Sequence, residues 1–135
     1  MDARELIRRY YDEVWVKGNV DAIDDLCAPD YVDHTPADDS AQLERLKRVA
    51  GVYRDTATEV ELELDVLVGE GDDVAAFWTM RWTQQGEFFG VPADGKRLTL
   101  RGAQFFRLRD GAIAETWHVD DYVRLFGQLG LTLKP

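Results

Sequence analysis

The residues best suited to chemistry lie near the C-terminus, on two runs whose pattern predicts a β-hairpin. Asp110-Gly111 separates residues 97–109 from residues 112–121, and Asp-Gly between two strand-like runs is a strong signal for a two-residue turn. In that register Leu100 pairs with Asp121, and directly opposite residues share one face of a sheet. Asp121 is therefore expected on the same face as a row of apolar side chains.

Polar exceptions on this predicted inner face are Gln104, Glu115 and Asp121, while Phe106 and Trp117 are among its apolar members. A carboxylate in apolar surroundings is costly unless it is hydrogen-bonded or shifted toward its neutral form. A raised carboxylate pKa suits general acid–base chemistry near neutral pH. We therefore predict that Asp121 works as an acid or base, with Gln104 beside it. A register change of one residue would swap the two faces and remove this argument.

Asp121 also has a structural interpretation. It precedes a short amphipathic run, residues 123–129, that predicts a closing helix. Asp is among the preferred N-cap residues, so its carboxylate could cap that helix instead of, or as well as, moving a proton. Gln104 likewise could be a structural hydrogen-bonding residue. Both interpretations of each residue stay open at this point.

The two histidines are the other groups that titrate near neutral pH. His34 follows Tyr31-Val32-Asp33, beside the expected mouth of the pocket, and either a catalytic or a structural role fits its position. The hairpin register puts His118 on the outer face, which argues against direct chemistry there. Cys27, the single cysteine, falls in an apolar helical stretch and is expected to pack as a small hydrophobic residue.

Metal and cofactor motifs are missing from the sequence. The two histidines and the cysteine are widely spread and show no zinc-ligand spacing. There is no glycine-rich phosphate loop and no Gly-x-Ser-x-Gly nucleophile elbow. We therefore expect chemistry without a metal or a cofactor.

Composition predicts one domain over residues 1–135 and limits its partners. With 26 acidic against 16 basic residues the net charge is −10, which disfavours nucleic acid and anionic membranes. The chain shows no signal-like start and no apolar run of about 18 residues. A single cysteine excludes an internal disulfide. We expect a soluble, cytoplasmic protein that binds a small molecule.

The elements that must position these residues follow from the spacing of apolar side chains. Helical spacing predicts helices over residues 2–17, 20–28 and 40–53, with Asp2 and Ser40 as N-caps.

Alternation of apolar and acidic residues predicts a half-buried strand over residues 58–68, with Val60, Leu62, Leu64, Val66 and Val68 on its inner face. A second strand, residues 74–84, contains Arg81 but alternates unevenly, so its faces cannot be assigned. Helices followed by a mostly antiparallel sheet predict an α+β fold.

The loop Gly86-Glu-Phe-Phe-Gly-Val-Pro-Ala-Asp-Gly-Lys-Arg97 resembles the Gly-x-Phe-x-Gly-x-Pro-x-x-Gly-Lys/Arg pattern of the SnoaL-like polyketide cyclase family. That family belongs to the nuclear-transport-factor-2-like superfamily. The resemblance spans almost the whole chain. Its other matching residues are Tyr31-Val32-x-His34, Phe106-Arg107, Asp110-Gly111-x-Ile113, Glu115, Trp117, Asp121 and Gln128-Leu129-Gly130.

The resemblance implies a cone-shaped α+β barrel, in which a curved sheet wraps three helices around a pocket, and it implies dimers. It also implies an aldol ring closure without metal or cofactor, with an aspartate matching Asp121 as the acid/base. Gln104 matches a polar pocket residue, and His34 lies near the base of related isomerases. The chain departs from the family at Trp82-Thr83-Gln84, where many members read Gly-Thr-His, and at Phe106, where some cyclases carry histidine.

We therefore expect a homodimeric, cofactor-independent enzyme that moves a proton next to the carbonyl of a small apolar compound. Cyclisation, isomerisation and dehydration share that step, so the sequence leaves cyclase, isomerase and lyase activity open. The expected catalytic residues are Asp121, His34 and Gln104, and the expected substrate contacts are Tyr11, Trp78, Arg81, Phe88, Phe106 and Trp117.

Two alternatives have the same fold. One is a non-catalytic module for ligand binding or dimerisation, because a fold does not determine a function. The other is a hydrolase or a hydroxylase-accessory enzyme of the superfamily. Epoxide hydrolases of the superfamily use an Asp-Arg-Asp grouping around a water, for which the sequence offers Asp121 and Arg81.

Overall fold

A curved, five-stranded sheet is the framework of the protein, whose computed structural model describes residues 2–35 and 42–131. The strand order is β1-β5-β4-β3-β2, with β1 parallel to β5 and all other neighbours antiparallel. The predicted α+β class is confirmed. The strands are β1 (Cys27–Asp33), β2 (Ala57–Glu70), β3 (Asp73–Gln84), β4 (Arg97–Arg109) and β5 (Ala112–Asp120).

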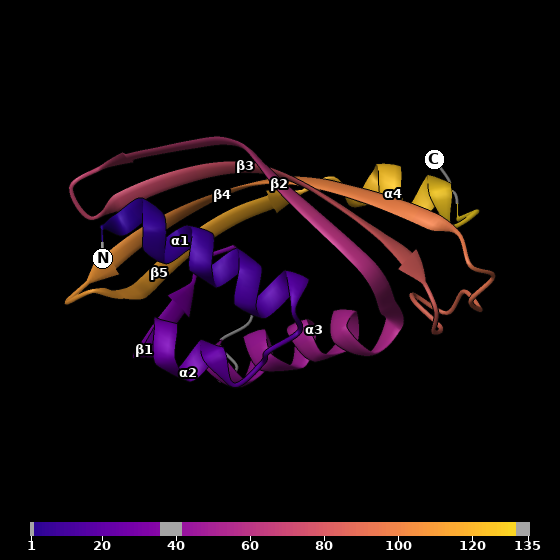
Figure 1. Cartoon of the computed structure of the whole chain (residues 1–135), viewed down its shortest axis with the longest axis horizontal. Coiled ribbons are helices and arrows are strands. Elements are labelled where there is room, and N and C mark those ends of the chain that lie inside the picture. The colour runs from indigo at the N-terminus through magenta and orange to yellow at the C-terminus, as the bar shows by residue number, and fades with distance from the viewer. Residues whose placement is uncertain (1, 36–41, 132–135) are drawn as a thin grey trace.

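Helices fill the concave side of this sheet, which arches over α1, α2 and α3 (Figure 1). The first helix begins as predicted, because the Asp2 carboxylate accepts a hydrogen bond from the backbone N–H of Glu5 at 2.9 Å. It then widens into a π-helix, which apolar spacing did not predict. The helices are α1 (Ala3–Tyr10), the π-helix η1 (Tyr11–Val16), α2 (Ala22–Leu26), α3 (Gln42–Thr56) and α4 (Tyr122–Gln128).

The structure differs from the prediction in the second helix. Cys27, expected in the second helix, is instead the first residue of β1, where it is buried. Ser40, the predicted cap of the third helix, lies outside the described residues. Within the described part of the chain, no helix is both long enough and apolar enough to cross a membrane.

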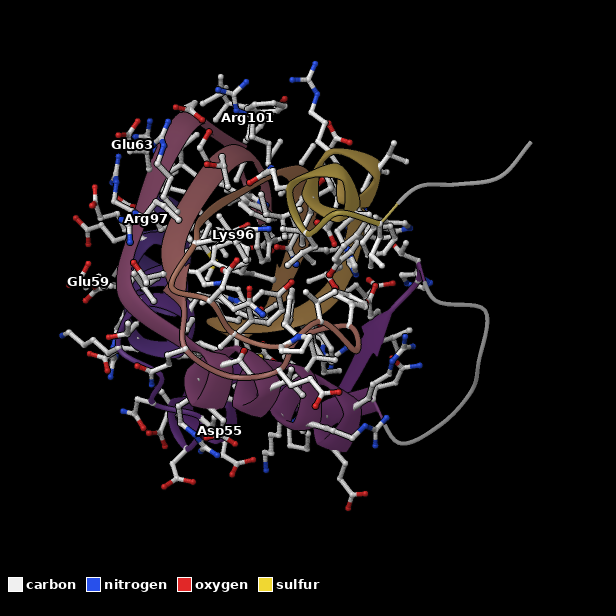
Figure 2. All side chains as sticks on the ribbon, turned by 90° about the vertical axis from the view of Figure 1, so that its right-hand side faces the viewer. Asp55, Glu59, Glu63, Lys96, Arg97 and Arg101 are labelled. Carbon is white, nitrogen blue, oxygen red and sulfur yellow. The ribbon has the colours of Figure 1, made fainter. Side chains whose placement is uncertain are left out.

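The core lies between the concave sheet face and the helices, with Ile7, Trp82, Phe106 and Leu125 fully buried there. Figure 2 shows the concave side of the sheet from one end: the sheet curves over the left and the top, and α3 lies at the bottom.

A β-bulge in β5 changes the predicted faces of the last hairpin. The turn itself is as predicted, since Leu108 pairs with Ile113. One residue further, Ala114 has no partner of its own, and from there the register is shifted so that Gly102 pairs with Asp120. Because side chains alternate along a strand, an extra residue exchanges the inner and outer sets. The predicted face assignment is therefore wrong beyond Ala114.

A second bulge interrupts β2. The predicted inward direction is confirmed as far as Leu64, which packs against the core. Asp65 is the extra residue, and beyond it the alternation is reversed. Val66 and Val68 are therefore 50% and 55% exposed, contrary to the prediction. Leu67 packs against the core in their place.

Candidate active site

A cavity of about 240 Å³ opens between the concave face of the sheet, η1 and α3. Its volume is just below the roughly 300–1,000 Å³ of common small-molecule pockets, so a small ligand fits it best. The wall is mostly aromatic and aliphatic, with Tyr11, Trp15 and Trp78 among its members. The polar residues of the wall are Asp33, Gln42, Arg45, Gln104, His118 and Asp120.

His118 lies between two carboxylates in this wall. Its Nε2 is 2.8 Å from Oδ2 of Asp33, and its Nδ1 is 3.0 Å from Oδ2 of Asp120. The parallel pairing of β1 with β5 puts Asp33 opposite Thr116, two residues before His118. The side chains of Asp33, His118 and Asp120 are 16%, 28% and 13% exposed, respectively. An imidazolium, which has a donor on each nitrogen, satisfies both contacts.

The two carboxylates keep the imidazole of His118 protonated. Burial lowers the pKa of His118, but the hydrogen bonds and negative charges of Asp120 and Asp33 outweigh it and raise the pKa from 6.5 to about 10. A protonated imidazole has no free lone pair, so His118 cannot act as a base at neutral pH. The groups of this cluster that can accept a proton are the carboxylates.

A second hydrogen bond orients an amide in the cavity. The hydroxyl of Tyr11, on η1, donates to Oε1 of Gln104, on β4, at 2.7 Å. Burial raises the pKa of Tyr11 well above its ordinary value, so the hydroxyl keeps its proton. Because Oε1 is the acceptor, the amide presents Nε2 as a donor. Among the described residues, none accepts a hydrogen bond from this nitrogen, which leaves it for a ligand.

Gly102 leaves room for two cavity residues to meet. A Cβ at this position would lie 2.5 Å from Cζ2 of Trp78 and 2.7 Å from Oδ1 of Asp120. The indole and the carboxylate oxygen therefore occupy the space where a side chain would be. Since Oδ2 of Asp120 contacts His118, Oδ1 is the carboxylate oxygen beside the indole.

The structure brings together only part of the predicted site. Gln104, Tyr11 and Trp78 line the cavity as expected. Phe88 and Phe106 are not part of its lining and are buried in the core, where Phe106 packs edge-on behind Tyr11. Their predicted contact with a substrate would need the wall to move.

Three other predicted residues lie on the outside of the sheet. Arg81 forms an ion pair with Glu63, with 3.6 Å between Nη1 and Oε1. Trp117 stacks on His34 with 4.5 Å between the ring centroids. Neither residue of this stack lines the cavity. Trp117 lies on the outside because of the bulge at Ala114. His34 directly follows Asp33, the last residue of β1, and therefore points to the opposite side.

Asp121 also lies outside the cavity lining. Its carboxylate caps α4, accepting a hydrogen bond from the backbone N–H of Arg124 at 3.3 Å, and its side chain is 42% exposed. The capping interpretation is confirmed, and the predicted position on the inner face is wrong because of the bulge. The cavity carboxylate is its neighbour, Asp120.

Sequence reasoning missed Asp33, His118 and Asp120. One available signal was the doublet Asp120-Asp121 at the end of a strand. Successive strand residues point to opposite faces, so one of the two carboxylates faces inwards in either register. The doublet therefore indicated an inward carboxylate without saying which residue carries it.

Replacing Gly102 with alanine tests the crowded space between Trp78 and Asp120. We expect Gly102→Ala to lower the free energy of unfolding by about 1–3 kcal/mol, because the new methyl group overpacks the wall. Gly127→Ala is the matched control: it adds the same methyl group in open space on α4, where alanine favours the helix by about 0.5–1 kcal/mol. Urea unfolding measures both. Equal stability of Gly102→Ala and the wild type would contradict the proposed crowding.

The raised pKa of His118 predicts a pH-dependent stability. Above pH 6.5 the unfolded chain has lost the proton of His118, while the folded protein keeps it up to about pH 10. The stabilisation is therefore complete below pH 6.5 and is lost as the pH rises toward 10, by at most about 1.4 kcal/mol per pH unit. Urea unfolding between pH 7 and 8.5 should show this decline for the wild type but not for His118→Gln. Parallel curves for the two proteins would show that His118 is not held as an imidazolium.

Comparisons with known proteins identify the family and support the fold. A model of the family described as SnoaL-like polyketide cyclase matches residues 5–129. TsrD from Streptomyces laurentii is 28% identical with a TM-score of 0.82, over 94% of this chain and 93% of TsrD. IdmH from Streptomyces antibioticus, a proposed polyketide cyclase, is 27% identical with a TM-score of 0.81, over 97% of this chain and 100% of IdmH.

A third solved structure carries a different suggested activity. AclR from Streptomyces galilaeus, a proposed hydroxylase, is 25% identical with a TM-score of 0.83, over 99% of this chain and 87% of AclR. No curated protein sequence matches the chain significantly. The fold and the family match over most of the chain lead to one conclusion: the chain belongs to the SnoaL-like polyketide cyclase family.

Proposed function

We propose that this protein is a cofactor-independent acid/base enzyme that removes a proton next to the carbonyl group of a small apolar compound, as a polyketide cyclase does. The observation that carries the proposal is the Asp33–His118–Asp120 cluster in the wall of an apolar cavity. A carboxylate that is ionised and oriented in such a wall can take a proton from a bound carbon acid. The family match supports a small-molecule substrate.

Asp120 acts as the base in this proposal. His118 holds its Oδ2 atom, so Oδ1, beside Trp78, is the atom that accepts the proton. The electron pair of the broken C–H bond then forms the C=C bond of an enolate, and the negative charge moves to the carbonyl oxygen. The protonated carboxyl can return its proton to the product. Ring closure, isomerisation and dehydration all start from this enolate.

Gln104 stabilises the enolate oxygen through the Nε2 donor that Tyr11 orients. Gln104 is opposite His118 in the sheet, and Asp120 is two residues further along β5 on the same face. The backbone positions of such diagonal neighbours are about 7–8 Å apart. This separation allows one end of a C–C=O unit to contact the base and the other end to contact the amide.

The roles of two predicted catalytic residues change accordingly. Asp121 and His34 lie outside the cavity lining, so the proposal assigns the base to Asp120 and gives His34 no contact with the substrate. His118 takes the part of a positioning residue, because it orients Asp120 without itself accepting a proton. We also propose the homodimer that the family resemblance implies, and the cytoplasmic location stays a prediction.

Hydrolysis is a second candidate function, because the cluster has one cation held between two carboxylates. This grouping is similar to the Asp-Arg-Asp set of the superfamily's epoxide hydrolases, with His118 in place of the arginine. Here Asp120 would take a proton from a water as its oxygen attacks a ring carbon of an epoxide. The opened oxygen would receive a proton from the imidazolium, so that the product is a diol.

The adjacent residues Asp120 and Asp121 give a matched test of the base. We expect Asp120→Asn to slow α-proton exchange of 2-tetralone into deuterium oxide, followed by proton NMR, by about 100- to 10,000-fold. Asp121→Asn should keep nearly the wild-type rate, because asparagine caps a helix as well as aspartate does. Styrene oxide, assayed for diol in parallel, tests the hydrolytic candidate.

The outcomes separate the candidates. Loss of exchange in Asp121→Asn with activity retained in Asp120→Asn would contradict the assignment of the base. Diol formation that depends on Asp120, without ketone exchange, would favour hydrolysis. If the wild type quenches its tryptophan fluorescence on binding 2-tetralone but converts neither compound, a binding module becomes the better description. Trp15 and Trp78, which line the cavity, are the expected reporters of binding.

A further inference from the structure

Two tyrosine hydroxyls meet in the wall of the cavity. Tyr53 on α3 and Tyr122 on α4 both line it, and their hydroxyl oxygens are 3.3 Å apart. We call these two residues the tyrosine pair. Burial raises the pKa of Tyr53 well above its ordinary value and raises the pKa of Tyr122 as well, and the negative charge of Asp120 adds to both rises. Both phenols are therefore protonated at neutral pH and act as hydrogen-bond donors.

The tyrosine pair has one hydroxyl hydrogen to spare. Two phenols carry two such hydrogens, and the hydrogen bond between them uses one. In the described part of the chain, neither hydroxyl has a second hydrogen-bond partner. Tyr53 is 6% exposed, whereas Tyr122 is half-buried. If Tyr53 donates to Tyr122, the less buried hydroxyl keeps its hydrogen for a ligand, and the bond that it accepts polarises it into a better donor.

Aromatic packing holds both rings of the pair in place. Tyr53 packs edge to face against Trp82 and Phe88, with 5.6 and 5.2 Å between the ring centroids. Tyr122 stacks on Phe126 with 5.8 Å between the centroids. Because the rings are fixed before a ligand arrives, little conformational entropy is lost when one binds. The pair is therefore built as a binding site is built, with its donor already oriented.

Along the sheet, Asp120 lies between the tyrosine pair and Gln104. Tyr53 packs on Trp82, which lies four residues beyond Trp78 on β3. Asp120 meets Trp78 itself, and Gln104 is opposite the residue of β3 two positions before Trp78. Successive residues on one face of a strand are about 6.7 Å apart. A ligand that contacts Gln104 therefore reaches the carboxylate first and the tyrosine pair beyond it.

The charges around the cavity favour an uncharged oxygen at the tyrosine pair. The cluster around His118 holds two carboxylates and one imidazolium, so its net charge is negative. An anionic oxygen beside Tyr122 would be repelled by Asp120, whereas a carbonyl or alkoxy oxygen accepts the same hydrogen bond without repulsion. Burial raises the pKa of Tyr31 on β1, and the positive charge of Arg45 works against that rise, so the cation of the wall acts on the β1 side of the cavity.

We propose that Tyr122, oriented by Tyr53, binds a second, uncharged oxygen of the substrate, on the far side of the acidic carbon from the carbonyl group that Gln104 contacts. The substrate then carries its acidic C–H group between two oxygen-bearing positions. Tyr122 binds and does not move a proton. The inference deepens the proposed function and rests on it for the position of the base, but the hydrogen bond forms whether or not a reaction follows.

Two isomeric ketones test this arrangement. In 8-methoxy-2-tetralone the most acidic methylene group lies between the carbonyl group and the methoxy oxygen. In 5-methoxy-2-tetralone the same methoxy group lies at the other end of the aromatic ring. We expect the wild type to bind the 8-methoxy isomer about 3- to 10-fold more tightly, which is the effect of one hydrogen bond. Quenching of tryptophan fluorescence measures both dissociation constants, with Trp15 and Trp78 in the cavity wall as reporters.

Tyrosine-to-phenylalanine variants identify the hydroxyl that is responsible. Tyr122→Phe should bind the two isomers with equal affinity, and Tyr53→Phe, which removes only the orienting hydrogen bond, should show a reduced preference. Tyr31→Phe is the matched control, because Tyr31 lines the same cavity but its hydroxyl is already hydrogen-bonded to Thr116 at 2.8 Å. It should keep the full preference. Circular dichroism checks folding, and the ratio of two dissociation constants from one preparation does not depend on the folded fraction.

A wild type that binds the isomers equally, or binds neither, would overturn the proposal. So would a preference that survives in folded Tyr122→Phe or that disappears equally in Tyr31→Phe. Exchange of 2-tetralone provides a separate readout of the chemistry. If exchange is absent while the preference depends on Tyr122, the proposed chemistry fails and the binding site stands. If exchange depends on Asp120 while the isomers bind alike, the binding site fails and the chemistry stands.

Discussion

The extra residue at Ala114 in β5 is the constraint on which most of the site depends. A strand turns successive side chains to opposite faces, so one inserted residue reverses the direction of every residue that follows. Beyond Ala114 this reversal points His118 and Asp120 into the cavity and Trp117 and Val119 to the outside. The same local irregularity thus turns His118 and Asp120 of the polar cluster to the concave face, and Trp117 and Val119 to the convex face.

Inside the cavity, His118, Asp33, Asp120 and the Gln104 carbonyl oxygen are each held by a neighbouring side chain. The carboxylates of Asp33 and Asp120 compensate the charge of His118, whose burial would otherwise favour the neutral ring. Tyr11 holds the amide of Gln104. These groups are oriented before a ligand arrives. They can therefore stabilise a developing charge without first rearranging.

Much of this architecture could be predicted from local patterns. Asp2 at the first helix, the Asp110-Gly111 turn and the α+β class follow from capping, turn chemistry and the order of elements. The bulges could not be placed in the same way. Ala112, Ile113 and Ala114 are all apolar, so both faces of the strand look alike there and the sequence does not indicate where the alternation breaks. In β2 the run Val66-Leu67-Val68 was a visible break in the alternation, and it coincides with the change of face.

Site residues were placed correctly where their position does not depend on the register of β5, and wrongly where it does. Gln104 and Tyr11 line the cavity as expected, since neither lies on the strand that carries the bulge. Asp121 was placed by counting along β5, and one extra residue exchanges it for Asp120. The cluster around His118 also needs Asp33 from β1, and a parallel contact between strands so far apart in the chain has no local signature.

The protonation state of His118 is the most direct test of this account. Nitrogen-15 NMR of the imidazole side chains distinguishes the imidazolium from the neutral ring, and His34→Gln assigns the signals because the chain has two histidines. The account predicts that His118 is doubly protonated at pH 8 and titrates at about pH 10. A neutral ring at pH 8, with titration near the ordinary value of about 6.5, would contradict the cluster and the register that builds it.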